Sequence, residues 1–311
     1  MSVDLAFDDA QQAIHDAVAR FCAERGAGSA QSEFSLASWR ELAGLGVLAL
    51  TTPEGEGGAA ECVAALEALG AAAFPGPLAA SFLATAVLPE AERRGVADGE
   101  VIACVGTPPL MPFAPQAQLF LAVEGERLWR ARPIGEVEPV ETLGGEPWGR
   151  VALEGQAELS PCPAAFALFD LAEAALLAAH GAALLDAATE HARTRRQFGR
   201  AIGEFQAVAH PLADASIRLA AARSLARAAA CAFDAASDAA CTRRLAAAAR
   251  ASARGAALES AHVAHQTFGA LGITVEGPAF RISRRIRQRA AQPTGAAARA
   301  ACDALLGPLG W

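Results

Sequence analysis

Two short segments, far apart in the chain, contain the side chains best suited to binding an anionic ligand. Residues 192–206 combine four arginines with glutamines and phenylalanines, and residues 265–274 combine a glutamine with glycines. A guanidinium can bind two phosphate oxygens at once, a glutamine amide both donates and accepts hydrogen bonds, and glycine lets backbone approach a ligand closely. The candidate binding residues are Arg195, Gln197, Phe198, Gln206, Gln266, Gly269 and Gly272.

These patterns also have structural interpretations. The arginines of the first segment could form a solvated helix end, where cations interact favourably with the helix dipole. His262 and His265 are three residues apart on a predicted helix and could ligate a metal, but no third ligand is evident, which favours packed or surface histidines. The arginine-rich run 281–289 could meet a phosphate or an acidic partner, and a solvated or interface face is the favoured interpretation.

Composition and charge indicate a folded protein. The chain has 311 residues, of which 53% are hydrophobic and 19% charged, so it can bury a large core or divide into two or three domains. All 26 basic residues are arginine, and the net charge is -8. Because no basic stripe outweighs the acids, a nucleic-acid partner is not expected.

Three further features suggest a cytoplasmic protein. The seven cysteines are scattered without paired spacing, which favours reduced thiols packed as small core residues. The chain starts without a basic region before an apolar stretch, so no signal peptide is expected. Charged residues interrupt the apolar runs before about 18 residues, so no membrane span is expected.

The hydrophobic patterns divide the chain into three blocks. Residues 1–98 form a predicted N-terminal helical domain, 99–160 a short β domain, and 161–311 an alanine-rich helical bundle. In the β domain, strands are expected at 119–123, 127–130 and 148–153. In the bundle, a seven-residue pattern predicts a closely packed helix whose buried seam is Leu212, Ala215, Leu219, Ala222, Ala226, Ala229 and Phe233.

The two candidate segments, together with this order of blocks, resemble the acyl-CoA dehydrogenase family. Further segments that resemble it are residues 39–46, 53–54, 57–58 and 66–70. The resemblance implies a mainly α fold with a small β domain, FAD as cofactor, and α,β-desaturation of an acyl-CoA thioester. It also implies that Arg195 binds the FAD pyrophosphate, that Phe198 packs against the adenosine half, and that these groups reach across a subunit interface.

The chain departs from the family pattern at three places, and the mildest departure is Ala270 in place of the second glycine of a Gly-Gly pair. In the β domain, residues 104–111 lack the expected Thr-Glu-Pro segment, and neither Trp129 nor Trp148 has the expected neighbours. Ala220 stands at one family position of the catalytic glutamate, and residues 290–295, at the other position, contain no carboxylate. The resemblance therefore implies a subunit without its own catalytic base, because such a base must lie within hydrogen-bond reach of the proton it removes.

The chain thus resembles the shorter, degenerate subunit of heteromeric actinobacterial acyl-CoA dehydrogenases. That resemblance implies an α2β2 heterotetramer with a homologous catalytic partner that holds most of the acyl-CoA, a bulky steroid side-chain substrate, and an electron-transfer flavoprotein as acceptor. Two alternatives stay open. One is a self-sufficient flavoenzyme whose base has moved, for example to Glu204 or Glu276. The other is a non-catalytic scaffold subunit that has lost contact with flavin.

Overall fold

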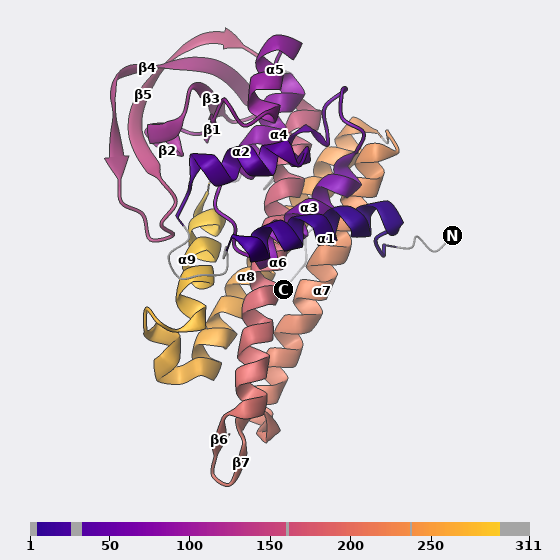
Figure 1. The fold of residues 1–311 in the computed structure, drawn as a ribbon, viewed down its shortest axis with the longest axis vertical. Coiled ribbons are helices and arrows are strands. Elements are labelled where there is room, and N and C mark those ends of the chain that lie inside the picture. The colour runs from indigo at the N-terminus through magenta and orange to yellow at the C-terminus, as the bar shows by residue number, and fades with distance from the viewer. Residues whose placement is uncertain (1–4, 26–32, 160–161, 237, 293–311) are drawn as a thin grey trace, which may run out of the picture.

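The computed structural model describes residues 5–25, 33–159, 162–236 and 238–292, and it is mainly helical with a five-stranded sheet and a two-stranded hairpin (Figure 1). The N-terminal block contains helices α1 (Asp9–Glu24), α2 (Leu36–Gly44), α3 (Ala59–Ala71), α4 (Leu78–Val87) and α5 (Glu90–Ala97), with a short 3-10 turn η1 (Val47–Ala49). The bundle contains α6 (Pro163–Thr194), α7 (Gln206–Asp234), α8 (Ala239–Phe268) and α9 (Pro278–Ala291).

Polar caps fix where the first helices begin. Asp8 accepts a hydrogen bond from the N–H of Gln11, whose side chain bonds back to the N–H of Asp8, so α1 starts with a capping box. At α3 the cap comes from the distant end of α7, where Asp234 accepts from the N–H groups of Ala59 and Ala60 at 2.7 and 2.9 Å. A side chain at Gly58 would lie 2.7 Å from this carboxylate, so glycine makes the tertiary cap possible.

The sheet joins five strands in the order β1-β3-β4-β5-β2. Their bounds are β1 (Ala103–Gly106), β2 (Leu110–Pro112), β3 (Leu119–Glu124), β4 (Arg127–Val140) and β5 (Trp148–Glu158), with a turn η2 (Ala114–Gln116). β1 runs parallel to β3 and the other pairs are antiparallel. A Cβ on Gly106 of β1 would lie 3.3 Å from Pro112 of β2, so the sheet curls until its edges approach each other.

The three expected strands are present, but β4 and β5 extend beyond the predicted 127–130 and 148–153. Their outer halves are mostly exposed and include Pro133, Gly135 and Gly155, so little apolar alternation marks them in the sequence. Arginine–glutamate pairs across the strands stabilise this region, including Arg132 with Glu154.

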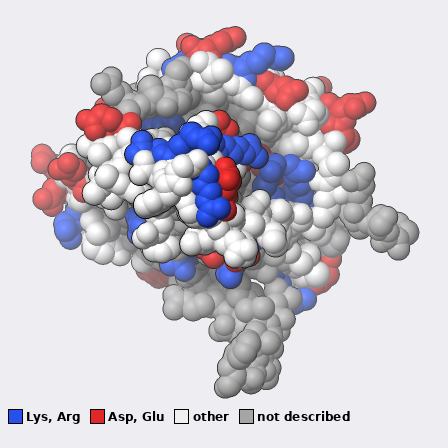
Figure 2. Space-filling view, turned by 90° about the horizontal axis from the view of Figure 1, so that it is seen from below, with Lys and Arg blue, Asp and Glu red and all other residues white. Residues whose placement is uncertain are grey.

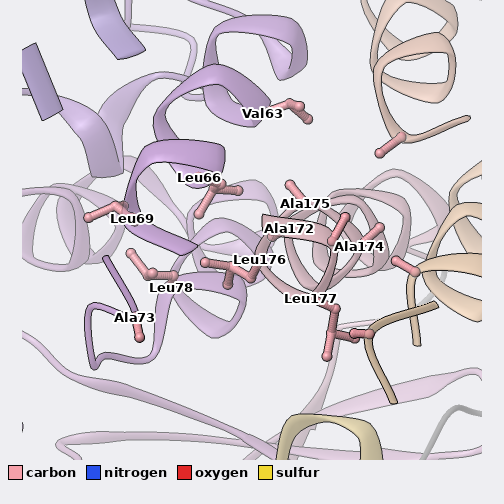
Figure 3. Close-up of a cluster of buried hydrophobic side chains, with 14 of the residues drawn as sticks. Val63, Leu66, Leu69, Ala73, Leu78, Ala172, Ala174, Ala175, Leu176 and Leu177 are labelled. Carbon is pink, nitrogen blue, oxygen red and sulfur yellow. The ribbon is translucent and has the colours of Figure 1, made fainter. Parts of the chain in front are cut away.

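α6 is the central helix of the molecule and packs against α3, α4, α7, α8 and α9. Figure 3 shows leucines of α3 meeting Ala172, Ala175 and Leu176 of α6. Small residues bring the backbones close, since a Cβ on Gly70 would lie 2.7 Å from Ala179. The predicted seam of α7 is confirmed from Leu212 to Ala229, and Phe233 is partly buried.

By length and composition, α6 could span a membrane, but 83% of its most apolar window is buried by other parts of the protein. The sequence expectation that charges interrupt every apolar run is therefore too strict for this helix. Its apolar character is explained by packing on nearly all sides in the core.

The remaining short elements lie at the lower end of the bundle in Figure 1. They are β6 (Arg196–Gln197), β7 (Arg200–Ala201), η3 (Ile202–Glu204) and η4 (Gly269–Ile273). The sheet and the N-terminal helices lie at the opposite, upper end (Figure 1). The molecule therefore has two separated regions in which ligands could be held.

Candidate functional site

The first candidate segment forms a tight hairpin beyond the end of α6. Arg195 is the C-cap of α6 and its N–H donates to the carbonyl of His191 at 2.8 Å. β6 and β7 then pair around a two-residue turn, in which Phe198 and Gly199 have φ angles of 53° and 81°. Positive φ at both positions is the geometry that two-residue hairpins prefer, because it matches the twist of the strands.

Phe198 is unusual in both conformation and exposure. Phenylalanine rarely adopts positive φ, and its side chain is 93% exposed. Its ring and that of Phe205 form a T-shaped pair with centroids 6.2 Å apart, and the guanidinium of Arg200 lies 4.0 Å from the Phe205 centroid. The hairpin therefore holds an aromatic ring out into solvent at a conformational cost, a kind of strain that clusters at functional sites.

The second candidate segment caps the end of α8. Gly269 is the C-cap with φ 59° and ψ -128°, a conformation close to that reserved for glycine, and a Cβ there would meet nothing within 4 Å. Gln266 is exposed on the last turn of α8. Gly272 is buried instead, where a Cβ would lie 2.9 Å from the carbonyl oxygen of His265. Open space for a ligand thus lies beside Gly269, while Gly272 allows tight packing of η4.

The structure brings the two segments to the same end of the bundle. The rings of His191 of α6 and Phe268 of α8 pack against each other at a tilt of 49°, with centroids 5.1 Å apart. The N–H of Ile202 donates to the carbonyl of Arg195 at 2.8 Å, which holds η3 against the end of α6. Gln206 follows as the exposed first residue of α7.

The surface at this end is basic and partly apolar. Figure 2 looks onto it and shows arginines gathered beside uncharged surface. The exposed arginines of the hairpin region are Arg193, Arg195, Arg196 and Arg200. Exposed apolar side chains follow α8, namely Leu271, Ile273 and Val275. Cations beside open backbone and an aromatic ring can bind an anion that carries a flat apolar group.

Of the candidate catalytic positions, Glu204 lies within the first segment, Glu276 lies just after the second, and Ala220 lies further along α7. Ala220 is exposed on α7. Glu204 is exposed and accepts from the N–H of Ala201 at 3.2 Å, and Glu276 is exposed after η4. Residues 293–295 lie outside the described part of the chain.

The two histidines near the end of α8 are the candidate metal ligands. His262 is exposed and His265 half-buried. In the described ranges, no group of three or more His, Cys, Asp or Glu side chains is placed to hold a metal ion.

A cavity of about 290 Å³, which the sequence interpretation missed, lies between the curled sheet and the starts of α6 and α8. Its polar side chains include Asp170, Arg243 and Arg250, and Asp170 is ion-paired with both arginines. A usable signal was present in the sequence, because Asp170 and Glu173 are charged residues within the apolar first half of α6 and a buried charge requires a partner. The identity of that partner could not be deduced, because α8 lies more than 70 residues further along the chain.

The arginines of α9 correct another expectation. Arg285 and Arg289 are buried, not solvated, and Arg289 donates to Glu173 and Glu146 at 2.9 and 3.1 Å. Nearby, burial and the charge of Arg289 lower the pKa of His180 to about 3. This cluster joins α9, α6 and the loop between β4 and β5, so two of the five arginines of the run serve the interior.

Comparisons with known proteins match two parts of the chain to the same family. The family description "Acyl-CoA dehydrogenase, C-terminal domain" matches residues 169–292, and "Acyl-CoA dehydrogenase, N-terminal domain" matches residues 8–95. Acyl-CoA dehydrogenase IpdE2 of Mycobacterium tuberculosis is 33% identical over 244 residues, covering 69% of this chain and 74% of that protein. This chain belongs to the acyl-CoA dehydrogenase family.

Solved structures share the fold. The Tcur3481–Tcur3483 steroid acyl-CoA dehydrogenase has a chain with TM-score 0.79 and 24% identity, covering 95% of this chain and 97% of that one. A chain of the ChsE4–ChsE5 complex from Mycobacterium tuberculosis gives a TM-score of 0.77 at 24% identity, and the match covers 98% of this chain and 100% of that one. The structure of PigA with FAD and proline gives a TM-score of 0.79 at 21% identity, and the match covers 98% of this chain and 99% of that one. The predicted fold class is confirmed, and FAD is confirmed as the cofactor of the family.

Proposed function

We propose that this chain is the non-catalytic subunit of a heteromeric, FAD-dependent acyl-CoA dehydrogenase and completes the flavin site of a homologous partner. One observation carries the proposal. The candidate cofactor residues lie in or next to β6, β7, the start of α7 and the end of α8, at the lower end of the bundle in Figure 1, whereas residues of the sheet and of the starts of α6 and α8 line the cavity. Asp170 and Thr194 are 24 residues apart on α6, which is about 36 Å at the rise of a helix. A single dinucleotide does not bridge that distance, so the hairpin serves a flavin held mainly by another subunit.

The residues at the lower end fit the adenosine half of FAD. Arg195 would bind the pyrophosphate, Phe198 would pack on the adenosine, and the open side of Gly269 would let backbone N–H groups approach a phosphate. The glutamines at 197, 206 and 266 would supply hydrogen bonds, and Gly272 would keep η4 tightly packed. When bound, FAD supplies a hydride acceptor for the β-carbon of the acyl chain.

The partner would supply the rest of the active centre. Because Ala220 carries no carboxylate, the glutamate that removes the α-proton and most of the acyl-CoA pocket belong to the partner in this proposal. Loss of a general base costs about 10²–10⁴-fold in rate, so the isolated chain should not desaturate acyl-CoA. A relative named as a steroid acyl-CoA dehydrogenase and a two-protein complex support an α2β2 assembly acting on a bulky, steroid-type acyl group. An electron-transfer flavoprotein is the proposed acceptor, and the cytoplasm the proposed location.

Flavin content tests this function directly. The purified chain alone should be folded and colourless, whereas its complex with the partner should contain one FAD for each pair of unlike subunits. Arg195→Ala should leave the complex assembled and remove most of the flavin. An isolated chain that is yellow, with about one flavin per chain, would overturn the proposal.

A self-sufficient flavoenzyme is the second candidate, and the cavity beside the sheet is the observation in its favour. The same flavin measurement separates the two. Neither Glu204 nor Glu276 lines that cavity, so each would make a poor base for a substrate bound there. A scaffold without flavin contact would instead leave the flavin of the complex unchanged by Arg195→Ala.

A further inference from the structure

A small cavity lies where the N-terminal helices, the sheet and the bundle meet, and we call it the junction cavity. The N-terminal block contributes residues 76–80 to its lining, the sheet contributes Val105 and Pro112, and the bundle contributes Glu173 and Arg289. Its volume of about 20 Å³ suits one water molecule and is too small for an organic ligand.

The two charged residues of this lining are deeply buried and only partly hydrogen-bonded. Glu173 and Arg289 are 2% and 3% exposed. Arg289 Nη1 donates to Glu173 Oε1 at 2.9 Å, and Arg289 Nη2 donates to Glu146 Oε1 and to the carbonyl oxygen of Gly76. These bonds leave Glu173 Oε2 and Arg289 Nε without a hydrogen-bond partner in the described part of the chain. One strong acceptor and one strong donor of the lining are therefore unused.

Unused polar atoms at buried positions are unfavourable, because folding removes their hydrogen bonds to solvent. Internal water molecules commonly satisfy such groups and usually make about three hydrogen bonds each. A water molecule can accept from the N–H of Arg289 and donate to the carboxylate of Glu173 at the same time. The carbonyl oxygen of Gly76, which also lines the cavity, has a second lone pair for a third bond.

The charges around the junction cavity favour a neutral ligand over an ion. Glu146 and Glu173 are both ion-paired with Arg289, and the buried Arg285 lies close enough to Glu146 to interact with its charge. Two carboxylates thus accompany two guanidinium groups. A bound ion would leave this buried cluster unbalanced, which is unfavourable in a low dielectric.

We propose that the junction cavity is a binding site for one internal water molecule, which hydrogen-bonds to Glu173 and Arg289. Arg289 contacts α6 through Glu173, the loop between β4 and β5 through Glu146, and the turn before α4 through Gly76. The water completes this network at the point where the three blocks are held together. The site is separate from the flavin contacts, and the proposal does not depend on the proposed function.

A crystal structure of the full chain, at a resolution that shows ordered waters, tests the site without any substitution. A water should lie within hydrogen-bond distance, about 2.7–3.2 Å, of both Glu173 Oε2 and Arg289 Nε. Absence of density in the cavity would overturn the proposal. So would a Glu173 rotamer in which the second oxygen bonds directly to Arg289 Nε.

Two substitutions of nearly equal shape test the polarity of the site in solution. Ala79, at 3% exposure, lines the cavity, and both Ala79→Val and Ala79→Thr would fill it. Only the threonine hydroxyl can replace the hydrogen bonds of the water, so Ala79→Thr should unfold about 2 °C or more above Ala79→Val. Ala68, equally buried on α3, is the matched control and should show the opposite order, because its surroundings are apolar. The same order at both positions would overturn the proposal.

Magnetic relaxation dispersion of water ¹⁷O counts the long-lived internal waters of the folded chain. Ala79→Val should hold one fewer than the wild type, and Ala68→Val should hold the same number. Circular dichroism confirms that each variant is folded. An unchanged count in folded Ala79→Val would overturn the proposal.

Discussion

The imidazole of His191 packs at a tilt against the ring of Phe268, with centroids 5.1 Å apart, and this contact joins the ends of α6 and α8. The hairpin begins at Arg196, shortly after His191, and Gly269 directly follows Phe268. The relative position of the two candidate cofactor segments therefore depends on a packed pair that does not itself need to touch a ligand.

Phe268→Ala should disturb both stability and flavin binding. Phe268 is 6% exposed, and truncating a buried phenylalanine lowers the free energy of unfolding by about 3 kcal/mol or more. Urea denaturation gives the stability, and visible absorbance gives the flavin content of the complex. Phe268→Leu retains most of the volume and should be milder in both assays. A Phe268→Ala complex with full flavin would show that the pair does not position the site.

Phe198→Gly should have opposite effects on stability and on flavin binding. Glycine adopts positive φ without strain, so the isolated chain should gain about 1 kcal/mol in free energy of unfolding. Loss of the exposed ring should weaken FAD binding in the complex. The checks are urea denaturation of the chain and flavin titration of the apo complex. Unchanged flavin affinity would remove Phe198 from the proposed site.

Asp234→Ala should destabilise α3 from a distance in sequence. The carboxylate accepts from two N–H groups at the start of α3, and loss of such a cap costs about 1 kcal/mol. Asp214→Ala, exposed on the same helix, is the control and should change the free energy of unfolding by less than about 0.5 kcal/mol. Equal effects of the two substitutions in urea denaturation would argue against the tertiary cap.

His180 should make the protein less stable as the pH falls below about 6.5. Burial lowers its pKa to about 3, so between these values the unfolded chain binds a proton that the native state does not. Stability is therefore lost on acidification through this window, with a slope of at most about 1.4 kcal/mol per pH unit from this residue.

His180→Leu isolates that contribution. Its slope of unfolding free energy against pH should be shallower than that of the wild type between about pH 5 and 6.5, and the slopes should coincide near about pH 7.5. Because the substitution also changes packing, the slopes are compared and not the absolute stabilities. Parallel curves across the whole range would contradict a neutral, buried His180.

Periodic features were the most predictable parts of the fold. The seven-residue pattern from Leu212 identified the buried face of α7, since a helix buried on one side has apolar residues at regular intervals in its sequence. The outer halves of β4 and β5 show no apolar alternation in the sequence, because they are largely exposed on both faces and contain proline and glycine.

The candidate cofactor segments were found because each is local in sequence. The hairpin and the end of α8 hold their candidate residues within a few positions of one another. The Asp170 cluster was missed because its members come from two helices whose alignment only the tertiary structure reveals. A buried charge in α6 indicated that an ion pair must exist, but it did not indicate which arginines form it.

One unbroken 32-residue helix, α6, runs from the cavity beside the sheet to the hairpin. Its length fixes both the distance and the relative orientation of the cavity and the hairpin. Adding or removing one residue would move the hairpin by about 1.5 Å and turn it by about 100° relative to the cavity. Phe198 would then face another direction although every local contact of the hairpin survived. Length changes in homologous subunits that keep this arrangement should therefore fall outside residues 163–194.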